Sequence, residues 1–345
     1  MIKKRHLCIY PINFILLIRR LHLEGAWAQL TFKWKSGMKL SQESLYINAG
    51  DHRLHLRHIW GTQNKPVVVM FHGVIEDGSI FYKNDDKGLA NFLARNDFDV
   101  YVVDFRGKGR STPTIMQNSE HGQQDVILGD IPSVIGYLRR RTGQRINVIC
   151  HSWGGVLFSS AYVRSNGFDN GIASIICFGT KRRVSVWNMD RIIKVSLFWN
   201  NLAPLISRRR GYLDAKYYGI GGAPETRKFI KQSVEWVRKK RWVDPVDQFN
   251  YYSAAKHIKW PPTWYMTGVS DFSLGHATDV FNFLKETHHP DARFTVLSKD
   301  NGNLINYDHI NILTHRLAEQ DHFISICDWL SLQSSNGNRP SHSKH

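Results

Sequence analysis

Short runs of consecutive apolar residues recur along the chain, separated by longer amphipathic stretches. Four such runs occupy residues 66–71, 99–103, 146–150 and 172–178. An apolar run without a polar face is typical of a strand that is buried on both sides, as in a parallel sheet covered by helices. Helical periodicity between the runs completes an alternation of strand and helix. The pattern predicts an α/β fold with a mostly parallel, doubly wound sheet.

The alternation begins with a hairpin and is interrupted once. Residues 44–61 alternate apolar and polar positions around a Gly-Asp turn, which predicts two antiparallel strands. Residues 181–259 show helical periodicity, four tryptophans and clustered arginines, and we expect no buried strand there. We therefore expect a core made of residues 38–180 and 260–333, with residues 181–259 inserted as a helical cap.

Two terminal segments lie outside this alternation. Residues 1–37 form a basic leader with an apolar stretch of twelve residues, which is too short to span a bilayer as a helix. A signal peptide, a basic amphipathic surface anchor and an inert leader all stay open, and Met38 is a possible true start. Residues 334–345 are polar and contain glycine and proline, which predicts a disordered tail.

The third apolar run ends at a serine in the stretch INVICHSWGGVLFSS, residues 146–160. A strand, a tight turn around Ser152 and a following helix are the context of a nucleophile elbow, which lifts a serine hydroxyl above the ends of the strands. The turn requires small residues two positions before and after the serine. Gly154 meets this requirement, whereas Cys150 stands where glycine is usual.

A serine nucleophile needs a base, and the base needs a carboxylate to orient it. In this strand and helix order the acid and the histidine follow the serine. Asp271 comes directly after the strand TWYMTG, and His309 follows the strand RFTVL and a polar loop. Because catalytic groups gather at the carboxyl ends of parallel strands, we expect Ser152, Asp271 and His309 to form a triad.

Acyl transfer also requires hydrogen-bond donors for the oxyanion that develops on the substrate. The geometry of an elbow makes the backbone N–H of Trp153 one donor. The loop FHGVIEDG, residues 71–78, offers the backbone N–H of Val74 as the second. We expect His72 in this loop to be a structural hydrogen-bonding residue.

With these residues in place, residues 43–332 resemble the α/β-hydrolase superfamily of serine hydrolases. The stretches HGVIEDGSIF, GVSDFSLGHATDV and YDHINILTHRLAEQDHFISICDWL are similar to its lipase and esterase branch. The elbow HSWGG is nearer to esterases and to monoglyceride-lipase-like or prolyl-aminopeptidase-like members. The resemblance implies an α/β-hydrolase fold with a cap, but it does not define the substrate.

The expected reaction is hydrolysis of a carboxylic ester through an acyl-enzyme on Ser152. Suitable substrates are an acylglycerol, a lysophospholipid or a similar apolar ester. A prolyl-aminopeptidase-like peptidase, a thioesterase, and a non-catalytic binding protein at the membrane surface stay open as alternatives.

The chain carries a net charge of +17, and this charge is unevenly placed. Residues 1–37 contribute +6 and residues 181–259 contribute +12. Basic residues interleaved with tryptophan suit a surface that meets anionic lipid, and a solvated helical face is the alternative. We expect a cytoplasmic protein with possible peripheral membrane contact, and no nucleic-acid partner, because no known binding motif accompanies the charge.

No cofactor or metal is expected. The four cysteines are scattered singly, which favours reduced thiols, and the 17 histidines show no metal-binding spacing. The GxG of residues 107–109 lacks the third glycine and the following helix of a dinucleotide-binding loop.

Overall fold

The computed structural model describes residues 39–83 and 86–337. The leader predicted for residues 1–37 lies outside the described residues, as do positions 338–345 of the predicted tail.

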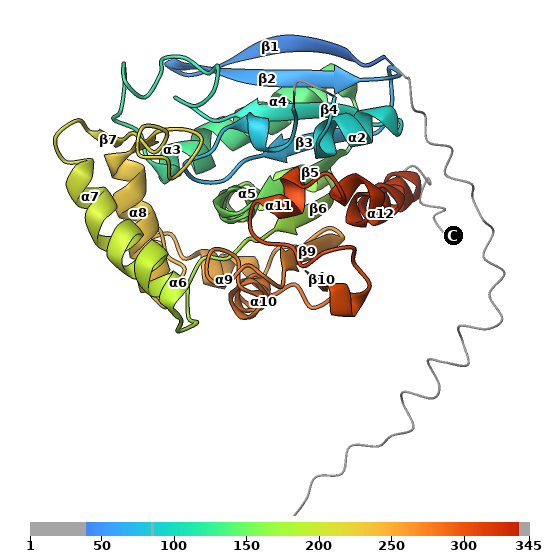
Figure 1. Ribbon diagram of the computed structural model, residues 1–345. Coiled ribbons are helices and arrows are strands. Elements are labelled where there is room, and N and C mark those ends of the chain that lie inside the picture. The colour runs from blue at the N-terminus through green and yellow to red at the C-terminus, as the bar shows by residue number, and fades with distance from the viewer. Residues whose placement is uncertain (1–38, 84–85, 338–345) are drawn as a thin grey trace, which may run out of the picture. The chain divides into compact units, whose positions relative to one another are not determined.

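An eight-stranded sheet, in the order β1-β2-β4-β3-β5-β6-β9-β10, forms the centre of the fold (Figure 1). The first three strands in this order pair antiparallel, and every pair from β4 to β10 is parallel. The strands are β1 Ser41–Ala49, β2 His52–Trp60, β3 Val67–Phe71, β4 Asp99–Asp104, β5 Ile146–His151, β6 Ile172–Phe178, β9 Thr263–Gly268 and β10 Arg293–Leu297. The mostly parallel sheet and its N-terminal hairpin confirm the predictions.

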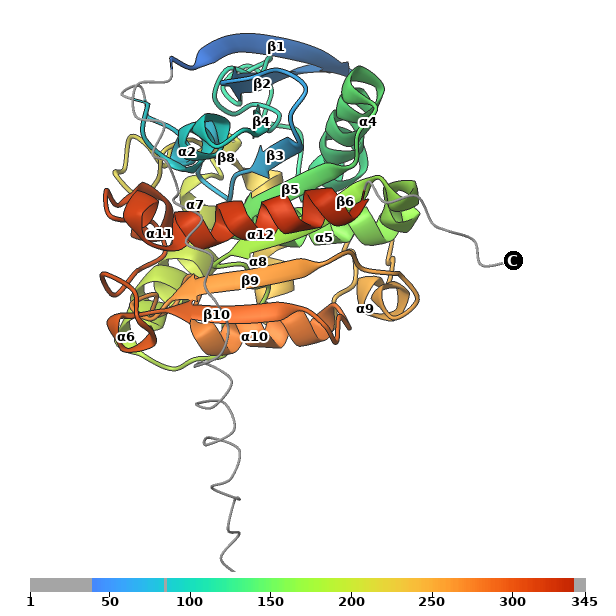
Figure 2. The ribbon, with the colours of Figure 1, turned by 90° about the vertical axis from the view of Figure 1, so that its right-hand side faces the viewer.

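Helices cover the sheet on both faces (Figure 2). On one face lie α2 (Leu89–Arg95) and α12 (His322–Gly337), and on the other lie α4 (Ile131–Thr142), α5 (Trp153–Arg164) and α10 (Ala277–Glu286). Short helices also lie in the core, outside the segment between β6 and β9. They are η1 Gly78–Ile80, α3 Gln123–Asp125, η2 Val126–Asp130, η3 Asn166–Asn170, η5 Lys299–Asn301, α11 Asn311–Thr314 and η6 Ala318–Gln320.

Strand β3 illustrates why the apolar runs lack a polar face. Its five side chains are all fully buried. Val67, Val69 and Phe71 join the core cluster under α4 and α5, whereas Val68 and Met70 join the cluster under α2 and α12. Because successive side chains of a strand point to opposite faces, both sets must be apolar when helices cover both faces.

The chain leaves the sheet after β6 and returns in β9, the neighbouring strand. The intervening segment contains α6 Met189–Arg191, η4 Ile192–Leu202, α7 Ala203–Ile206, β7 Tyr212–Leu213, β8 Glu225–Thr226, α8 Arg227–Arg238 and α9 Tyr251–Ala255. The paired two-residue strands β7 and β8 are partly buried, and here the prediction of no buried strand was wrong. Two residues are too short to produce an alternating pattern.

Part of the basic surface predicted for residues 181–259 is buried. Lys181 is 8% exposed, Arg182 is fully buried, and so are Trp236 and Trp242. Both tryptophan rings contact the Tyr251 ring, Trp236 edge-on and Trp242 stacked, and all three residues belong to the core. The prediction that they are interleaved with basic residues on a surface is therefore wrong. The remaining basic residues at 208–210 and 238–241 are exposed.

The last helix continues past the predicted start of the disordered tail. Ser334 lies in α12, where its hydroxyl donates to the Leu330 carbonyl and accepts from the Asn147 side-chain amide. The predicted boundary at 334 was therefore too early, because these contacts hold the final turn. No helix in residues 39–83 or 86–337 has the length and apolar character required to cross a membrane.

Candidate active site

Ser152 lies in the turn between β5 and α5. Its backbone has φ +52° and ψ −125°, a conformation that residues other than glycine rarely adopt. Such strain persists only where the surrounding structure enforces it, and it is typical of functional sites. The turn raises the Ser152 side chain above the carboxyl end of β5, as the elbow motif predicts.

Backbone packing requires glycine at position 154, two residues after the serine. A Cβ atom at Gly154 would lie 2.4 Å from the His72 carbonyl oxygen, so no larger residue fits. Two positions before the serine, where the motif usually has glycine, a cysteine side chain fits into the core. Cys150 is fully buried in β5, where it faces the core beneath the α5 side of the sheet.

Three side chains that are far apart in the chain form one hydrogen-bonded series. The Ser152 hydroxyl lies 2.9 Å from Nε2 of His309, and Nδ1 of His309 lies 2.5 Å from Oδ2 of Asp271. All three residues are less than 9% exposed. The structure thus brings together the three residues predicted as a triad.

The electrostatics of this series favour an ionised Asp271. Burial alone would raise the pKa of Asp271, but His309, the backbone N–H of Gly275 and the Lys181 ammonium together lower it. A carboxylate at this position accepts a hydrogen bond from the Nδ1–H of His309. The Nε2 atom of His309 is then unprotonated and can accept the proton of the serine hydroxyl.

The two predicted oxyanion donors lie beside Ser152. Trp153 is the first residue of α5, a position whose N–H has no acceptor within its own helix. Val74 follows Gly73, whose Cβ position would lie 2.9 Å from Cβ of Ser152, so only glycine allows this approach. Val74 and Trp153 both line the pocket into which Ser152 opens.

This pocket has a volume of about 770 Å³ and a mostly apolar wall. Its apolar side chains come from the loop after β3, from the start of α5, from the segment between β6 and β9, from the loop after β9, and from the residues around His309. They are Val74, Ile75, Ile80, Trp153, Val184, Ile193, Val195, Phe198, Trp199, Ile220, Val237, Leu274 and Ile310. A ligand with an apolar chain would bury much of its surface there.

An ion pair next to the triad was missed at the sequence level. His151 precedes Ser152 and is fully buried, and its Nδ1 lies 2.8 Å from Oε2 of Glu76. Its Nε2 donates to the backbone carbonyl of His309 at 2.9 Å. The same Glu76 oxygen accepts the N–H of Gly73 at 2.8 Å. The pair therefore joins the elbow, the Val74 loop and the His309 loop.

The geometry requires a positively charged His151. Both of its ring nitrogens face oxygen acceptors, and only an imidazolium has two N–H donors. Burial alone would lower the pKa of His151, but Glu76 and the His309 carbonyl raise it. Burial alone would raise the pKa of Glu76, whereas His151 lowers it to about 2. A glutamate three residues after Gly73 and a histidine beside Ser152 were the available clues in the sequence.

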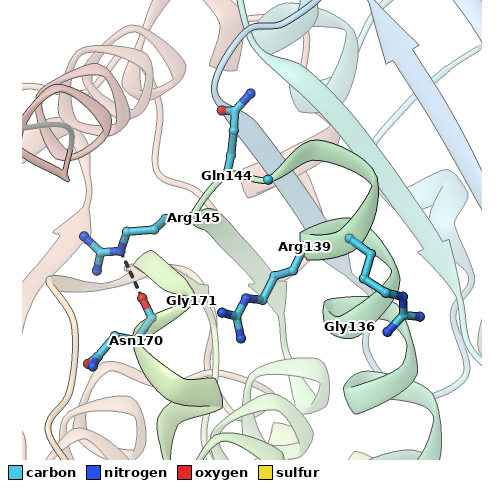
Figure 3. A pocket seen from close by; sticks show the side chains of 8 residues that line it. Gly136, Arg139, Gln144, Arg145, Asn170 and Gly171 are labelled. Atoms are coloured by element: carbon cyan, nitrogen blue, oxygen red, sulfur yellow. Dashed lines mark hydrogen bonds between the residues drawn. The ribbon is translucent and has the colours of Figure 1, made fainter.

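A second pocket, of about 440 Å³, lies at the opposite end of β5 and β6 (Figure 3). Arg139 and Arg145 line it, and both donate to backbone carbonyls, including that of Asn170. No serine or cysteine lines this pocket. The pocket at Ser152 is the candidate active site, because it contains the hydrogen-bonded series of Ser152 and His309. Across residues 39–83 and 86–337 there is no cluster of three His, Cys, Asp or Glu side chains suited to a metal ion.

Comparisons with known proteins agree with this architecture. A family model described as alpha/beta hydrolase fold matches residues 66–210. A soluble variant of monoglyceride lipase from Saccharomyces cerevisiae has a similar structure, with a TM-score of 0.63 and 15% sequence identity over 88% of this chain and 98% of that chain. Monoacylglycerol lipase from Paleococcus ferrophilus aligns with a TM-score of 0.54 and 17% identity over 81% of this chain and 99% of that chain.

A thioesterase domain from the curacin biosynthetic pathway also aligns, with a TM-score of 0.53 and 17% identity over 84% of this chain and 99% of that chain. The sequence has no match among the curated proteins. At such low identities the similarity defines the fold alone. The protein has the α/β-hydrolase fold, and its structural neighbours include esterases and lipases.

Proposed function

We propose that the protein is a serine hydrolase that cleaves a carboxylic ester, such as an acylglycerol, a lysophospholipid or a similar apolar ester. The observation that carries this proposal is the hydrogen-bonded series from Ser152 through His309 to Asp271, which opens into a largely apolar pocket. Several structural neighbours are named as lipases or esterases, which supports the same reaction class.

The proposed reaction begins when Nε2 of His309 takes the proton of the Ser152 hydroxyl as its oxygen attacks the ester carbonyl. The N–H groups of Val74 and Trp153 stabilise the negative oxygen that develops. Collapse of the intermediate releases the alcohol, which takes the proton from His309, and leaves the acyl group on Ser152. Water then attacks this acyl-enzyme with His309 as base, releasing the acid.

A fluorophosphonate probe tests this mechanism directly. We expect the wild type to be labelled at Ser152 and to hydrolyse p-nitrophenyl esters, and Ser152→Ala to do neither. Ser331→Ala is a matched control, because Ser331 lies on α12 and its hydroxyl only donates to the Cys327 carbonyl. Folded wild-type protein that is neither labelled nor active would contradict the proposal. Faster turnover of acyl-CoA or aminoacyl amides than of esters would favour the thioesterase or peptidase alternative.

We also propose that residues 181–259 act as a cap that meets an anionic membrane surface. Exposed apolar side chains lie along η4 and its flanks, among them Trp187, Ile193, Leu197 and Leu205, which are 79%, 54%, 54% and 61% exposed. The exposed basic residues 208–210 follow directly. Apolar and basic side chains together suit insertion at a lipid headgroup region.

Sedimentation with vesicles tests this surface. We expect binding to vesicles that contain phosphatidylserine and weaker binding to neutral vesicles. Leu197→Ser combined with Leu205→Ser should weaken binding while p-nitrophenyl ester turnover in solution is retained. Equal binding of the double variant and the wild type would exclude this surface.

A further inference from the structure

Lys181 differs from the other buried cations of the described chain. Four Lys or Arg residues in that part are less than 9% exposed. Three of them have carboxylate partners: Arg106 with Asp130, Lys108 with Glu225, and Arg182 with Glu286. The Lys181 ammonium has no carboxylate of the described residues within the 4.0 Å of an ion pair, and it makes no hydrogen bond to them.

Proteins rarely leave such a group without compensation. Removing an ammonium from water costs several kcal/mol unless an opposite charge or hydrogen-bond acceptors replace the water. Arg182, the next residue, shows full compensation, because it donates to three backbone carbonyls as well as to Glu286. Asp271 and Asp279 attract Lys181 from a distance, but neither forms an ion pair with it: Asp271 is held by His309, and Asp279 accepts from Ser185 through Oδ1, whereas its Oδ2 is buried without a hydrogen-bond partner. Burial accordingly lowers the pKa of Lys181.

The position of Lys181 relates it to the reaction site. It lines the pocket into which Ser152 opens. The preceding residue, Thr180, donates its hydroxyl to the Ser152 carbonyl at 3.0 Å, which ties this segment to the elbow. Two further lysines line the pocket: Lys83, which is exposed, and Lys194, which is half-exposed and paired with Asp190 at 2.7 Å. Lys181 is thus a desolvated cation in a mostly apolar wall, held close to the proposed nucleophile.

We propose that Lys181 binds an anionic group, a carboxylate or a phosphate, carried by the ester substrate. The inference rests on the proposed function and narrows its substrate class to esters with an apolar part and one anionic group. A substrate anion would supply the missing partner of the ammonium. A neutral ester would leave the Lys181 ammonium unpaired. Because a buried charge without a partner lowers affinity, the enzyme should select anionic esters over neutral ones.

Two matched pairs of esters test the proposal. In the first pair, p-nitrophenyl hydrogen glutarate carries a carboxylate on the acyl part, and p-nitrophenyl pentanoate is its neutral counterpart. In the second, 1-butyrylglycerol 3-phosphate carries a phosphate on the alcohol part, and 1-butyrylglycerol is neutral. We expect the wild type to prefer the anionic member of at least one pair in kcat/KM, and the preferred pair identifies the part of the substrate that faces Lys181.

Replacement of the cation should remove that preference. Lys181→Met should lower kcat/KM for the preferred anionic ester about 10-fold to 100-fold more than for its neutral counterpart, the usual effect of losing a hydrogen bond to a charged group. Lys181→Arg should retain most of the preference. Lys231→Met is the matched control, because Lys231 is exposed on α8 and lies outside the pocket.

A structural role would give different results. If Lys181 acted only by holding Asp271 ionised, Lys181→Met would lower turnover of neutral and anionic esters by the same factor, and this result would overturn the proposal. The thermal midpoint adds a second readout. Methionine replaces an unpaired buried charge, so we expect the variant to melt no lower than the wild type.

Binding separates failure of this inference from failure of the proposed function. Calorimetry on Ser152→Ala measures ethyl hydrogen glutarate and glycerol phosphate without turnover, and Ser152→Ala with Lys181→Met should bind the favoured anion at least tenfold more weakly. Loss of ester turnover with retained anion binding would reject only the hydrolase proposal. Ester turnover without any anion preference or anion binding would reject only the role of Lys181.

Discussion

The ion pair between Glu76 and His151 allows the sharpest quantitative prediction. Glu76→Gln keeps the shape of the side chain and removes its charge. The neutral amide can still accept from the Gly73 N–H, but it no longer stabilises an imidazolium at His151. A neutral His151 has a single N–H. If this proton stays on Nε2 for the His309 carbonyl, the new amide at position 76 can hold Nδ1 only by donating from its NH2 group, which then cannot accept from the Gly73 N–H, so one of the three hydrogen bonds is lost.

The magnitude follows from the depressed pKa of Glu76, which is lowered from 4.5 to about 2. Such a shift corresponds to about 3 kcal/mol of unfolding free energy at neutral pH. Because glutamine retains one acceptor, we expect Glu76→Gln to lose about 2 to 3 kcal/mol, within the usual cost of disrupting a buried ion pair. We also expect about tenfold slower fluorophosphonate labelling of Ser152, since the His309 loop loses an anchor.

The stability that the ion pair contributes decreases both at low pH and at high pH. The folded pKa of Glu76 is depressed, so its contribution is complete above about pH 4.5 and is lost as the pH falls toward 2. The folded pKa of His151 is raised from 6.5, so its contribution is complete below that value and is lost as the pH rises through the raised pKa. The stability difference between wild type and Glu76→Gln should therefore be largest between about pH 4.5 and 6.5.

Urea unfolding followed by tryptophan fluorescence at pH 3, 5.5, 7 and 9.5 measures this difference. Glu120→Gln is the control, because the Glu120 side chain is exposed and forms no ion pair among the described residues. A Glu76→Gln variant as stable as the control at pH 5.5, or with a difference that grows at pH 3, would refute the reasoning. Unchanged labelling of Ser152 would refute the anchoring role while leaving the energetic argument intact.

Three further predictions concern the triad, the insert and the elbow. Asp271→Asn should slow fluorophosphonate labelling by about 10³ to 10⁴-fold at pH 7, because His309 loses its orienting carboxylate; a loss below tenfold would contradict the triad. Arg182→Met should lower the unfolding free energy in urea by about 3 kcal/mol or more, since it leaves Glu286 and three carbonyls unpaired; an unchanged midpoint would argue against this. Gly154→Ala should reduce soluble, folded protein measured by circular dichroism, because its Cβ would lie 2.4 Å from a carbonyl oxygen, and native stability in this variant would be inconsistent with the tight turn.

Much of the fold was predictable because it rests on local pattern. The alternation of apolar runs with helices defined the sheet and its two covering layers, since burial on both faces leaves no polar position in strands such as β3. The elbow at Ser152 was predictable because a strand, a tight turn and a helix leave a continuous trace in the sequence. Asp271 and His309 were found from the order of the strands that precede them, because the carboxyl ends of parallel strands meet at one edge.

Tertiary structure alone decided which charges are buried and with which partners. Lys181, Arg182 and Arg183 look alike as a basic cluster, yet Arg182 is fully compensated and Lys181 lines the pocket without an ion-pair partner. Glu76 and His151 are 75 residues apart, and no local pattern relates them. Local sequence determines which backbone elements form, because their periodicity is short. The charge state and role of a side chain depend on groups brought near it by folding, and these come from distant parts of the chain.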